Sequence, residues 1–305
     1  MELHIVTSNK GGQGKTSLCL TLGAILRHSK KTLLYIDLNY SNNDLFSLFR
    51  RFARNEDDDS KILTFGEQDQ FEYFRLPRYS IFIVQPKERN ETYANPEILL
   101  NAIDQILGYF VNDIIINDWP KLNSPQVCIV DTNASIANFT APRSIITYPD
   151  KLKKLEVKLW ALMNFEEFNE MEALQIFRAI DNLESELPFF FTENDFYIVL
   201  QPDMNKLELA EFYPYKDQIG SYGISKSDIK ESLINMKQYF DEKLNGDFII
   251  SDKFNGYRPK NVIPLSMLNK YNLHSTIENI LRDNYTLALW EPELKKAVNE
   301  LNRNV

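Results

Sequence analysis

The sequence predicts an α/β fold, a doubly wound and mostly parallel sheet flanked by helices. Three observations predict this class. The first 40 residues alternate between a short apolar strand, a glycine loop, an amphipathic helix and a second buried strand. Further short apolar runs follow along the chain, and helical patterns lie between several of them. Strands that are joined through helices pair in parallel, because the crossover returns the chain to the same edge of the sheet.

Each element follows from its residue pattern. The first strand is expected over residues 3–8, and the helix that follows is expected over 17–27, with its leucines and isoleucine on one stripe. The second strand, 32–37, ends in Asp37 and is followed by Asn and Ser residues that are typical of a turn. Later strands are expected over 80–84, 127–131, 159–163, 196–201 and 262–265, and later helices over 96–110, 165–183, 226–244 and about 291–302.

Composition favours one globular domain. The 305 residues are 44% hydrophobic and 25% charged, which excludes a wholly disordered chain. We expect a single domain over 1–305, with insertions near 112–126 and 139–157, where the pattern matches no element. The start lacks the basic and apolar regions of a signal peptide, and no apolar run is long enough to cross a bilayer. A cytoplasmic protein is therefore expected.

The cysteines and the net charge argue against three further classes of protein: disulfide-stabilised proteins, cysteine-based metal proteins and proteins that coat nucleic acid. The two cysteines, Cys19 and Cys128, form neither a disulfide framework nor a metal-binding spacing. The net charge of −9 argues against a protein that coats nucleic acid over its whole surface, but it leaves room for a local basic patch.

Glycine is concentrated in the loop after the first strand. The chain has only 10 glycines, and three of them are Gly11, Gly12 and Gly14. Residues 9–17 read Asn-Lys-Gly-Gly-Gln-Gly-Lys-Thr-Ser, whereas the standard phosphate loop G-x-x-x-x-G-K-S/T would have its first glycine at Asn9. The strict pattern fails by one residue. A strand still precedes the loop and a helix follows it, so a phosphate loop is favoured over an ordinary turn.

The loop predicts a nucleotide site. Glycines let backbone N–H groups approach phosphate closely, and the start of the next helix favours negative charge. Lys15 is expected to reach the β and γ phosphates, and the Thr16 hydroxyl is expected to bind Mg²⁺. The predicted nucleotide-binding residues of the loop are Gly11, Gly12, Gln13, Gly14, Lys15, Thr16 and Ser17.

From Lys10 to Ser17 the loop resembles, without a mismatch, the deviant phosphate loop K-G-G-x-G-K-S/T of the ParA/MinD family of P-loop ATPases. The resemblance implies ATP and Mg²⁺ as cofactors and a homodimer that sandwiches ATP. In such a dimer Lys10 would reach the partner's phosphates and stabilise charge in the transition state, as an arginine finger supplied in trans does.

The second strand resembles the family segment that ends in D-x-D. Asp37 matches the first Asp and is expected near Mg²⁺, while the second Asp, which places the attacking water, is Asn39 here. Asn holds a water by hydrogen bonds but cannot accept its proton. Positioning matters more than a strong base in this reaction, so slow hydrolysis is expected, and an ATP-gated scaffold with almost none stays open. Asp44 could compensate, although a helix N-terminal Asp is the simpler interpretation.

Three weaker matches follow in the family's order. Residues 127–132 resemble its Walker B strand, so Asp131 would hold Mg²⁺ through a water, although the family's proline after Asp-Thr is replaced by Asn133. Gln201 stands where relatives have an Asn that reads the adenine edge. Pro264 ends a Val-Ile-Pro run that borders the base in partition ATPases. The resemblance thus implies Lys10, Lys15, Asp37 and Asn39 as catalytic residues and Thr16, Asp37 and Asp131 as metal residues.

The resemblance implies a ParA-like ATPase that dimerises on ATP and Mg²⁺, binds DNA nonspecifically and positions plasmid or chromosomal DNA with a ParB-like partner at the nucleoid. A MinD-like membrane protein is an alternative, but the acidic tail Glu291, Glu293 and Glu300 is unfavourable near anionic lipids, so no membrane partner is expected. Candidate DNA contacts are the basic residues Lys151, Lys153, Lys154, Lys158, Lys253, Arg258, Lys260, Arg282, Lys295, Lys296 and Arg303.

Overall fold

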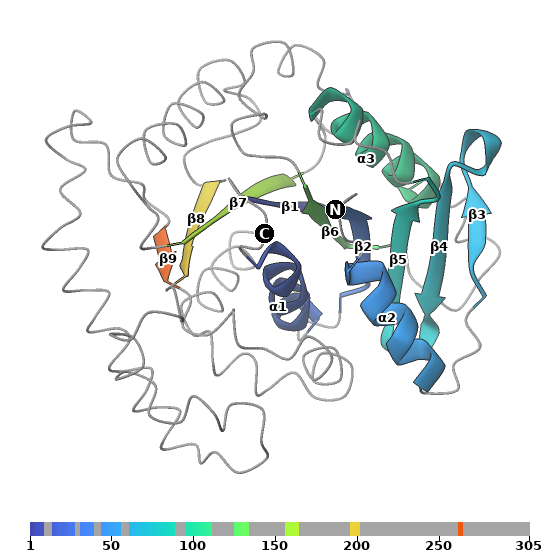
Figure 1. Cartoon of the computed structure of the whole chain (residues 1–305), viewed down its shortest axis with the longest axis horizontal. Helices are drawn as coiled ribbons and strands as arrows, with labels where there is room; N and C mark the ends of the chain where they lie inside the picture. The colour runs from blue at the N-terminus through green and yellow to red at the C-terminus, as the bar shows by residue number, and fades with distance from the viewer. Residues whose placement is uncertain are drawn as a thin grey trace, which may run out of the picture.

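The computed structural model describes residues 1–8, 14–27, 31–39, 44–55, 61–88, 96–111, 125–133, 156–164, 196–201 and 262–264. These residues form one nine-stranded sheet in the order β3-β4-β5-β2-β6-β1-β7-β8-β9 (Figure 1). The strands are β1 (Glu2–Ser8), β2 (Leu33–Leu38), β3 (Leu63–Phe65), β4 (Phe71–Leu76), β5 (Ile81–Pro86), β6 (Val127–Thr132), β7 (Glu156–Asn164), β8 (Phe196–Gln201) and β9 (Val262–Pro264). The helices are α1 (Lys15–Arg27), α2 (Asp44–Asn55) and α3 (Pro96–Val111), with short 3-10 turns at Glu67–Asp69 and Pro77–Tyr79.

The sheet is parallel except at one edge. All pairs from β5 through β2, β6, β1, β7, β8 and β9 are parallel, while β3, β4 and β5 pair in antiparallel fashion. The predicted doubly wound, mostly parallel fold is therefore confirmed. Because Asp131 of β6 is level with both Val6 of β1 and Asp37 of β2, the carboxyl ends of these three strands meet at one edge of the sheet.

Helices cover both faces. Figure 1 shows α1 and α2 on one face and α3 on the other. The α1 and α2 face has a core in which Val6, Tyr35, Ile129 and Trp160 are fully buried beneath the two helices. On the opposite face the ring of Phe110 from α3 lies 5.3 Å from that of Phe82. Side chains alternate between the two faces along each strand. Val6, Tyr35 and Ile129 face α1, so the residues two positions before and after each of them face α1 as well.

All seven predicted strands are present, with ends shifted by at most three residues. The predicted helix at 96–110 is confirmed as α3, while α1 begins at Lys15, two residues before the predicted 17. β7 begins at Glu156, inside the stretch 139–157 that was assigned to an insertion, so that prediction is wrong for its last two residues. The rest of this stretch, most of 112–126 and the predicted helices 165–183, 226–244 and 291–302 lie outside the described residues.

The sequence pattern did not predict β3, β4 or α2. Asp44 is the first residue of α2, which agrees with its interpretation as a helix N-terminal residue. Across the ranges that the structure describes, no helix combines the length and the apolar content that a bilayer crossing requires.

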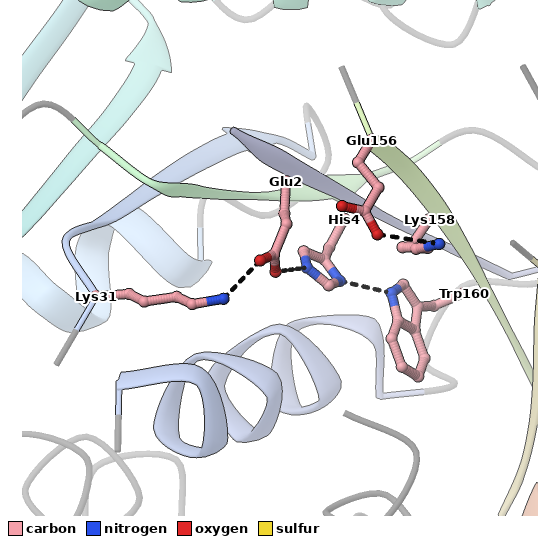
Figure 2. A network of polar contacts seen from close by, with 6 residues as sticks. All are labelled: Glu2, His4, Lys31, Glu156, Lys158 and Trp160. Carbon is pink, nitrogen blue, oxygen red and sulfur yellow. Dashed lines mark hydrogen bonds and ion pairs between the residues drawn. The ribbon is translucent and has the colours of Figure 1, made fainter. Parts of the chain in front are cut away.

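A polar network lies at the amino ends of β1 and β7, away from the carboxyl edge (Figure 2). His4 is fully buried, and its Nδ1 accepts a hydrogen bond of 3.0 Å from Trp160 Nε1. Its Nε2 lies 3.5 Å from a carboxylate oxygen of Glu2, whose other oxygen lies 2.5 Å from Lys31 Nζ. The network joins β1, β7 and the residues before β2.

Burial and charge set the ionisation of this network. Burial lowers the pKa of His4, and the hydrogen bond with Glu2 only partly opposes that effect, so the imidazole is neutral near pH 7. Burial alone would raise the pKa of Glu2, but its hydrogen bonds with His4 and Lys31 and the charge of Lys31 lower it to about 2. Because Trp160 donates to Nδ1, the neutral imidazole carries its proton on Nε2, toward Glu2.

Candidate nucleotide site

The glycine loop leads into α1 through Gly14. This residue has a φ of 85°, a left-handed conformation that glycine adopts without steric cost. Its carbonyl accepts the Leu18 N–H at 2.9 Å and so opens the first helical turn. The first turn contains no acidic residue, which leaves the positive end of α1 open to an anion.

Lys15 is held at this edge by Ser8. The lysine is 6% exposed, and its Nζ donates a hydrogen bond of 3.1 Å to Ser8 Oγ. Ser8 is the last residue of β1, so the strand ends with a hydroxyl that fixes the ammonium beside the loop. The sequence argument missed Ser8, although a hydroxyl at the last strand position before a glycine loop is a usable signal.

Thr16 and Asp131 are in direct contact. Thr16 Oγ1 donates a hydrogen bond of 2.5 Å to Asp131 Oδ2, and Asp131 is fully buried at the carboxyl end of β6. The structure thus brings together two of the three predicted metal residues from positions 115 apart in the sequence.

Asp37 lies at the same edge and also contacts α2. It is 2% exposed, and its two oxygens accept backbone N–H groups from Phe46 at 2.9 Å and from Asn39 at 3.2 Å. Phe46 belongs to the first turn of α2, so the carboxylate satisfies one of the N–H groups that a helix start leaves unpaired. Sequence reasoning placed Asp37 near Mg²⁺ and missed this contact. Asn39 is also buried, 8% exposed.

The charges at this edge are buried together. Asp37, Asp131 and Lys15 are all less than a tenth exposed, which gives two carboxylates against one ammonium. Burial raises the pKa of the Cys19 thiol on α1, and the nearby Asp131 and Asp37 raise it further. Cys19 therefore stays a neutral thiol, and the excess negative charge among these residues favours a cation.

The donor set fits magnesium. A hydroxyl and carboxylates are the hard oxygen ligands that Mg²⁺ prefers. Within the described ranges no three or more His, Cys, Asp and Glu residues gather into a metal cluster. Mg²⁺ bound with a nucleotide usually has one or two protein ligands and shares the rest of its coordination with phosphate oxygens and water.

The remaining predicted residues are described in part or not at all. Ser17 is buried in the first turn of α1. Gln201 and Pro264 are the last residues of β8 and β9, which end at the same edge, and their side chains are not described. Lys10, Gly11, Gly12 and Gln13 lie outside the described residues.

One predicted DNA contact is wrong. Lys158 is 7% exposed on β7, and its Nζ lies 3.3 Å from Glu156 Oε1, so it belongs to the network at the opposite end of the strands. Its position in the middle of a parallel sheet explains the burial. The other predicted contacts are outside the described residues.

The fold and this edge define a nucleotide-binding protein of the P-loop type. The sequence matches the family described as the CobQ/CobB/MinD/ParA nucleotide binding domain over residues 4–264, and the chain belongs to this family. The resemblance to the ParA/MinD family that the loop predicted is confirmed. No curated protein matches the chain in sequence.

Several solved structures are similar to this chain over most of its length. The MinD cell division protein of Aquifex aeolicus is 15% identical, with 99% of this chain and 96% of that chain covered and a TM-score of 0.43. An ATP complex of a Cyanothece McdA variant is 15% identical, covering 98% of this chain and 96% of that one, with a TM-score of 0.48. A plasmid partition protein of Borrelia burgdorferi is 15% identical, covering 93% and 98%, with a TM-score of 0.39.

Proposed function

We propose that this chain is a ParA-like ATPase. It binds ATP with Mg²⁺, dimerises on the nucleotide, binds DNA nonspecifically and positions plasmid or chromosomal DNA at the nucleoid with a ParB-like partner. The observation that carries the nucleotide part is the contact between Thr16 and Asp131 beside the buried Lys15. Membership of a nucleotide-binding family supports it.

Each residue at the edge has a role in this proposal. The start of α1 binds phosphate oxygens through backbone N–H groups, and Lys15, released from or shared with Ser8, neutralises the terminal phosphates. Thr16 and Asp131 hold the cation, Thr16 by its hydroxyl and Asp131 through a water. Mg²⁺ supplies charge neutralisation for the transferring phosphoryl group. Lys10 reaches the partner's phosphates in the dimer, and Gln201 and Pro264 border the base.

Replacement of Thr16 tests the cation site. Thr16→Ala removes the hydroxyl, so affinity for ATP in Mg²⁺ is expected to fall about tenfold, equivalent to about 1.4 kcal/mol. Affinity in EDTA should stay unchanged, and Thr16→Ser should retain binding. Thr21→Ala is the matched control, because Thr21 lies on the same helix and its hydroxyl donates to the Ser17 carbonyl at 2.8 Å. Wild-type protein that binds no ATP, or Thr16→Ala that binds ATP and Mg²⁺ normally, would refute the proposal.

Asn39 supports a second candidate, an ATP-gated scaffold with almost no hydrolysis. The residue stands beside Asp37 at the nucleotide edge and has no carboxylate to polarise a water. Turnover of wild type and Asn39→Asp, measured with DNA and partner present, separates the two functions. Turnover by the wild type supports the motor, and turnover only by Asn39→Asp supports the scaffold. If neither protein hydrolyses ATP, the motor proposal is wrong.

A further inference from the structure

The outer side of α2 carries a concentration of arginines that the nucleotide site does not use. Arg51 and Arg54 are exposed, and Arg50 is half-buried beside them. Residues three and four apart lie on one side of a helix, so these side chains form one patch. Together with Arg27 at the end of α1 and Arg78 after β4, they form what we name the α2 arginine surface: Arg27, Arg50, Arg51, Arg54 and Arg78.

Aromatic rings hold three of these guanidinium groups in place. The Cζ atoms of Arg27 and Arg78 lie 5.3 and 5.6 Å from the centroid of the buried Tyr79 ring. That ring is 5.9 Å from Phe52 of α2, which places both arginines beside the helix. Arg50 lies over Phe74 with its Cζ at 5.5 Å. A guanidinium over an aromatic ring keeps its N–H groups directed outward, where they bind oxyanions.

Few carboxylates offset this charge. The ion pairs found among the described residues do not include Arg51, Arg54 or Arg78. Glu72 has the same strand parity as Phe74 and so lies on this face. It accepts a hydrogen bond from the neutral Gln85 amide and keeps its negative charge, which the arginines outnumber. Among the described residues this side therefore carries more positive than negative side chains, although the chain as a whole has a net charge of −9, and positive charge attracts a polyanion.

We infer that the α2 arginine surface binds the phosphate backbone of duplex DNA. Several arginines on one side of the protein match a ligand with many phosphates better than a single anion, because a duplex presents one negative charge per about 1.7 Å of its axis. Arginine also pairs with phosphate through two parallel N–H groups. The inference rests on the proposed function, which requires nonspecific DNA binding, and assigns that binding to a surface different from the C-terminal lysines and arginines.

The test compares two double variants with the same change in charge. Arg51→Gln/Arg54→Gln removes two exposed arginines from the surface, while Lys61→Gln/Lys87→Gln removes two exposed lysines, one just before β3 and one just after β5. Binding of a fluorescent random 24-base-pair duplex is measured by anisotropy with ATP and Mg²⁺ over a range of salt. The arginine variant should lose about tenfold in affinity at 0.1 M salt. Its plot of log K against log salt should be shallower by about 1.8, since each lost phosphate contact removes about 0.9.

Further controls separate loss of a DNA contact from loss of folding or of ATP binding. Both variants should retain the wild-type Tm and ATP affinity, and Arg51→Lys/Arg54→Lys should retain the salt slope. The Lys61→Gln/Lys87→Gln control should bind DNA as wild type does. Equal losses in the two double variants, or no loss in the arginine variant, would refute the inference while leaving DNA binding by the protein intact.

A different set of results would refute the proposed function itself. Wild-type protein that binds ATP but no DNA would refute DNA binding as a whole. If the wild type instead binds anionic vesicles, or only an acidic partner protein, and the arginine variant loses that binding, the surface has another occupant and the inference is wrong.

Discussion

The contact between Asp37 and α2 predicts how the protein responds to Asp37→Ala in the absence of nucleotide. The carboxylate is 2% exposed and accepts the N–H groups of Phe46 at 2.9 Å and Asn39 at 3.2 Å. Alanine leaves both groups without this acceptor. A hydrogen bond to a charged group contributes about 1.5–3 kcal/mol, and the longer second bond about 1 kcal/mol. The free energy of unfolding should fall by about 2.5–4 kcal/mol.

The sign of the change distinguishes two roles for Asp37. If the carboxylate served only a cation, it would be an uncompensated buried charge near Asp131 when the cation is absent. Its removal would then raise stability, because two like charges at low dielectric repel. Loss of the α2 contact predicts the opposite change. The nucleotide-free protein therefore separates the two roles without any measurement of activity.

The assay is urea and thermal unfolding of the purified protein without nucleotide or Mg²⁺. Asp37→Asn keeps one oxygen acceptor and should lose about half as much stability as Asp37→Ala. Glu67→Ala removes an exposed carboxylate and serves as a control, with an expected change within about 0.5 kcal/mol. If Asp37→Ala is as stable as the wild type or more stable, the carboxylate does not anchor α2.

Two further predictions concern the core and the opposite end of the sheet. A Cβ at Gly23 would lie 1.6 Å from Tyr35 Oη, so Gly23→Ala should lower stability in urea unfolding by about 1–3 kcal/mol. Tyr35→Phe should recover part of that loss in the double variant. In the network of Figure 2, burial lowers the pKa of His4, so below pH 6.5 the unfolded chain binds a proton that the folded protein does not. Unfolding free energy should therefore fall as pH drops from 6.5 to 4.5, and His4→Gln should remove this slope.

Controls follow from the same contacts. Tyr35→Phe alone should be neutral or stabilising, because the buried hydroxyl has no hydrogen-bond partner among the described residues. A fully stable Gly23→Ala would contradict the packing argument. The part of the window above about pH 5.5 separates His4 from Glu2. The pKa of Glu2 is lowered from 4.5 to about 2, so its contribution to stability is lost as the pH falls from about 5.5 toward 2. An unchanged slope in His4→Gln would assign the pH dependence to another group.

The parallel part of the sheet was predictable because its strands are continuous apolar runs, typical of strands buried on both faces. The antiparallel edge was not. Strand β3 has only three residues. Ile62 just before it and Leu63 within it are both exposed apolar side chains, so the segment lacks the alternation of apolar and polar residues that predicts a strand. Helix α2 was missed although its residues carry a helical signal. Leu45, Phe46, Phe49, Phe52 and Ala53 recur at helical spacing and are buried, while the three arginines of the helix lie off that stripe.

The candidate site was predictable where two signals agree, namely the alternation of side chains along a strand and the position of a motif residue at its end. Ser8, Asp37 and Asp131 each come two residues after a core residue of the α1 face, namely Val6, Tyr35 and Ile129. Alternation therefore directs them toward the start of α1. Their partners were less predictable. The bonds from Lys15 to Ser8 and from Phe46 to Asp37 depend on how a loop and a helix start are placed in space, which residue types and spacing do not specify.

Capping of α2 and cation binding are compatible roles for Asp37. A carboxylate has about four lone-pair positions, and the two backbone N–H groups occupy one on each oxygen. In the sheet, Asp131 lies on β6 on one side of β2, while α2 packs against β2 and its neighbour on the other side, β5, so Asp37 lies between the two. The unfolding measurement tests the first role, and the Mg²⁺ dependence of ATP binding tests the second. Since neither result determines the other, Asp37→Ala that is destabilised yet binds ATP and Mg²⁺ normally would assign the carboxylate to α2 alone.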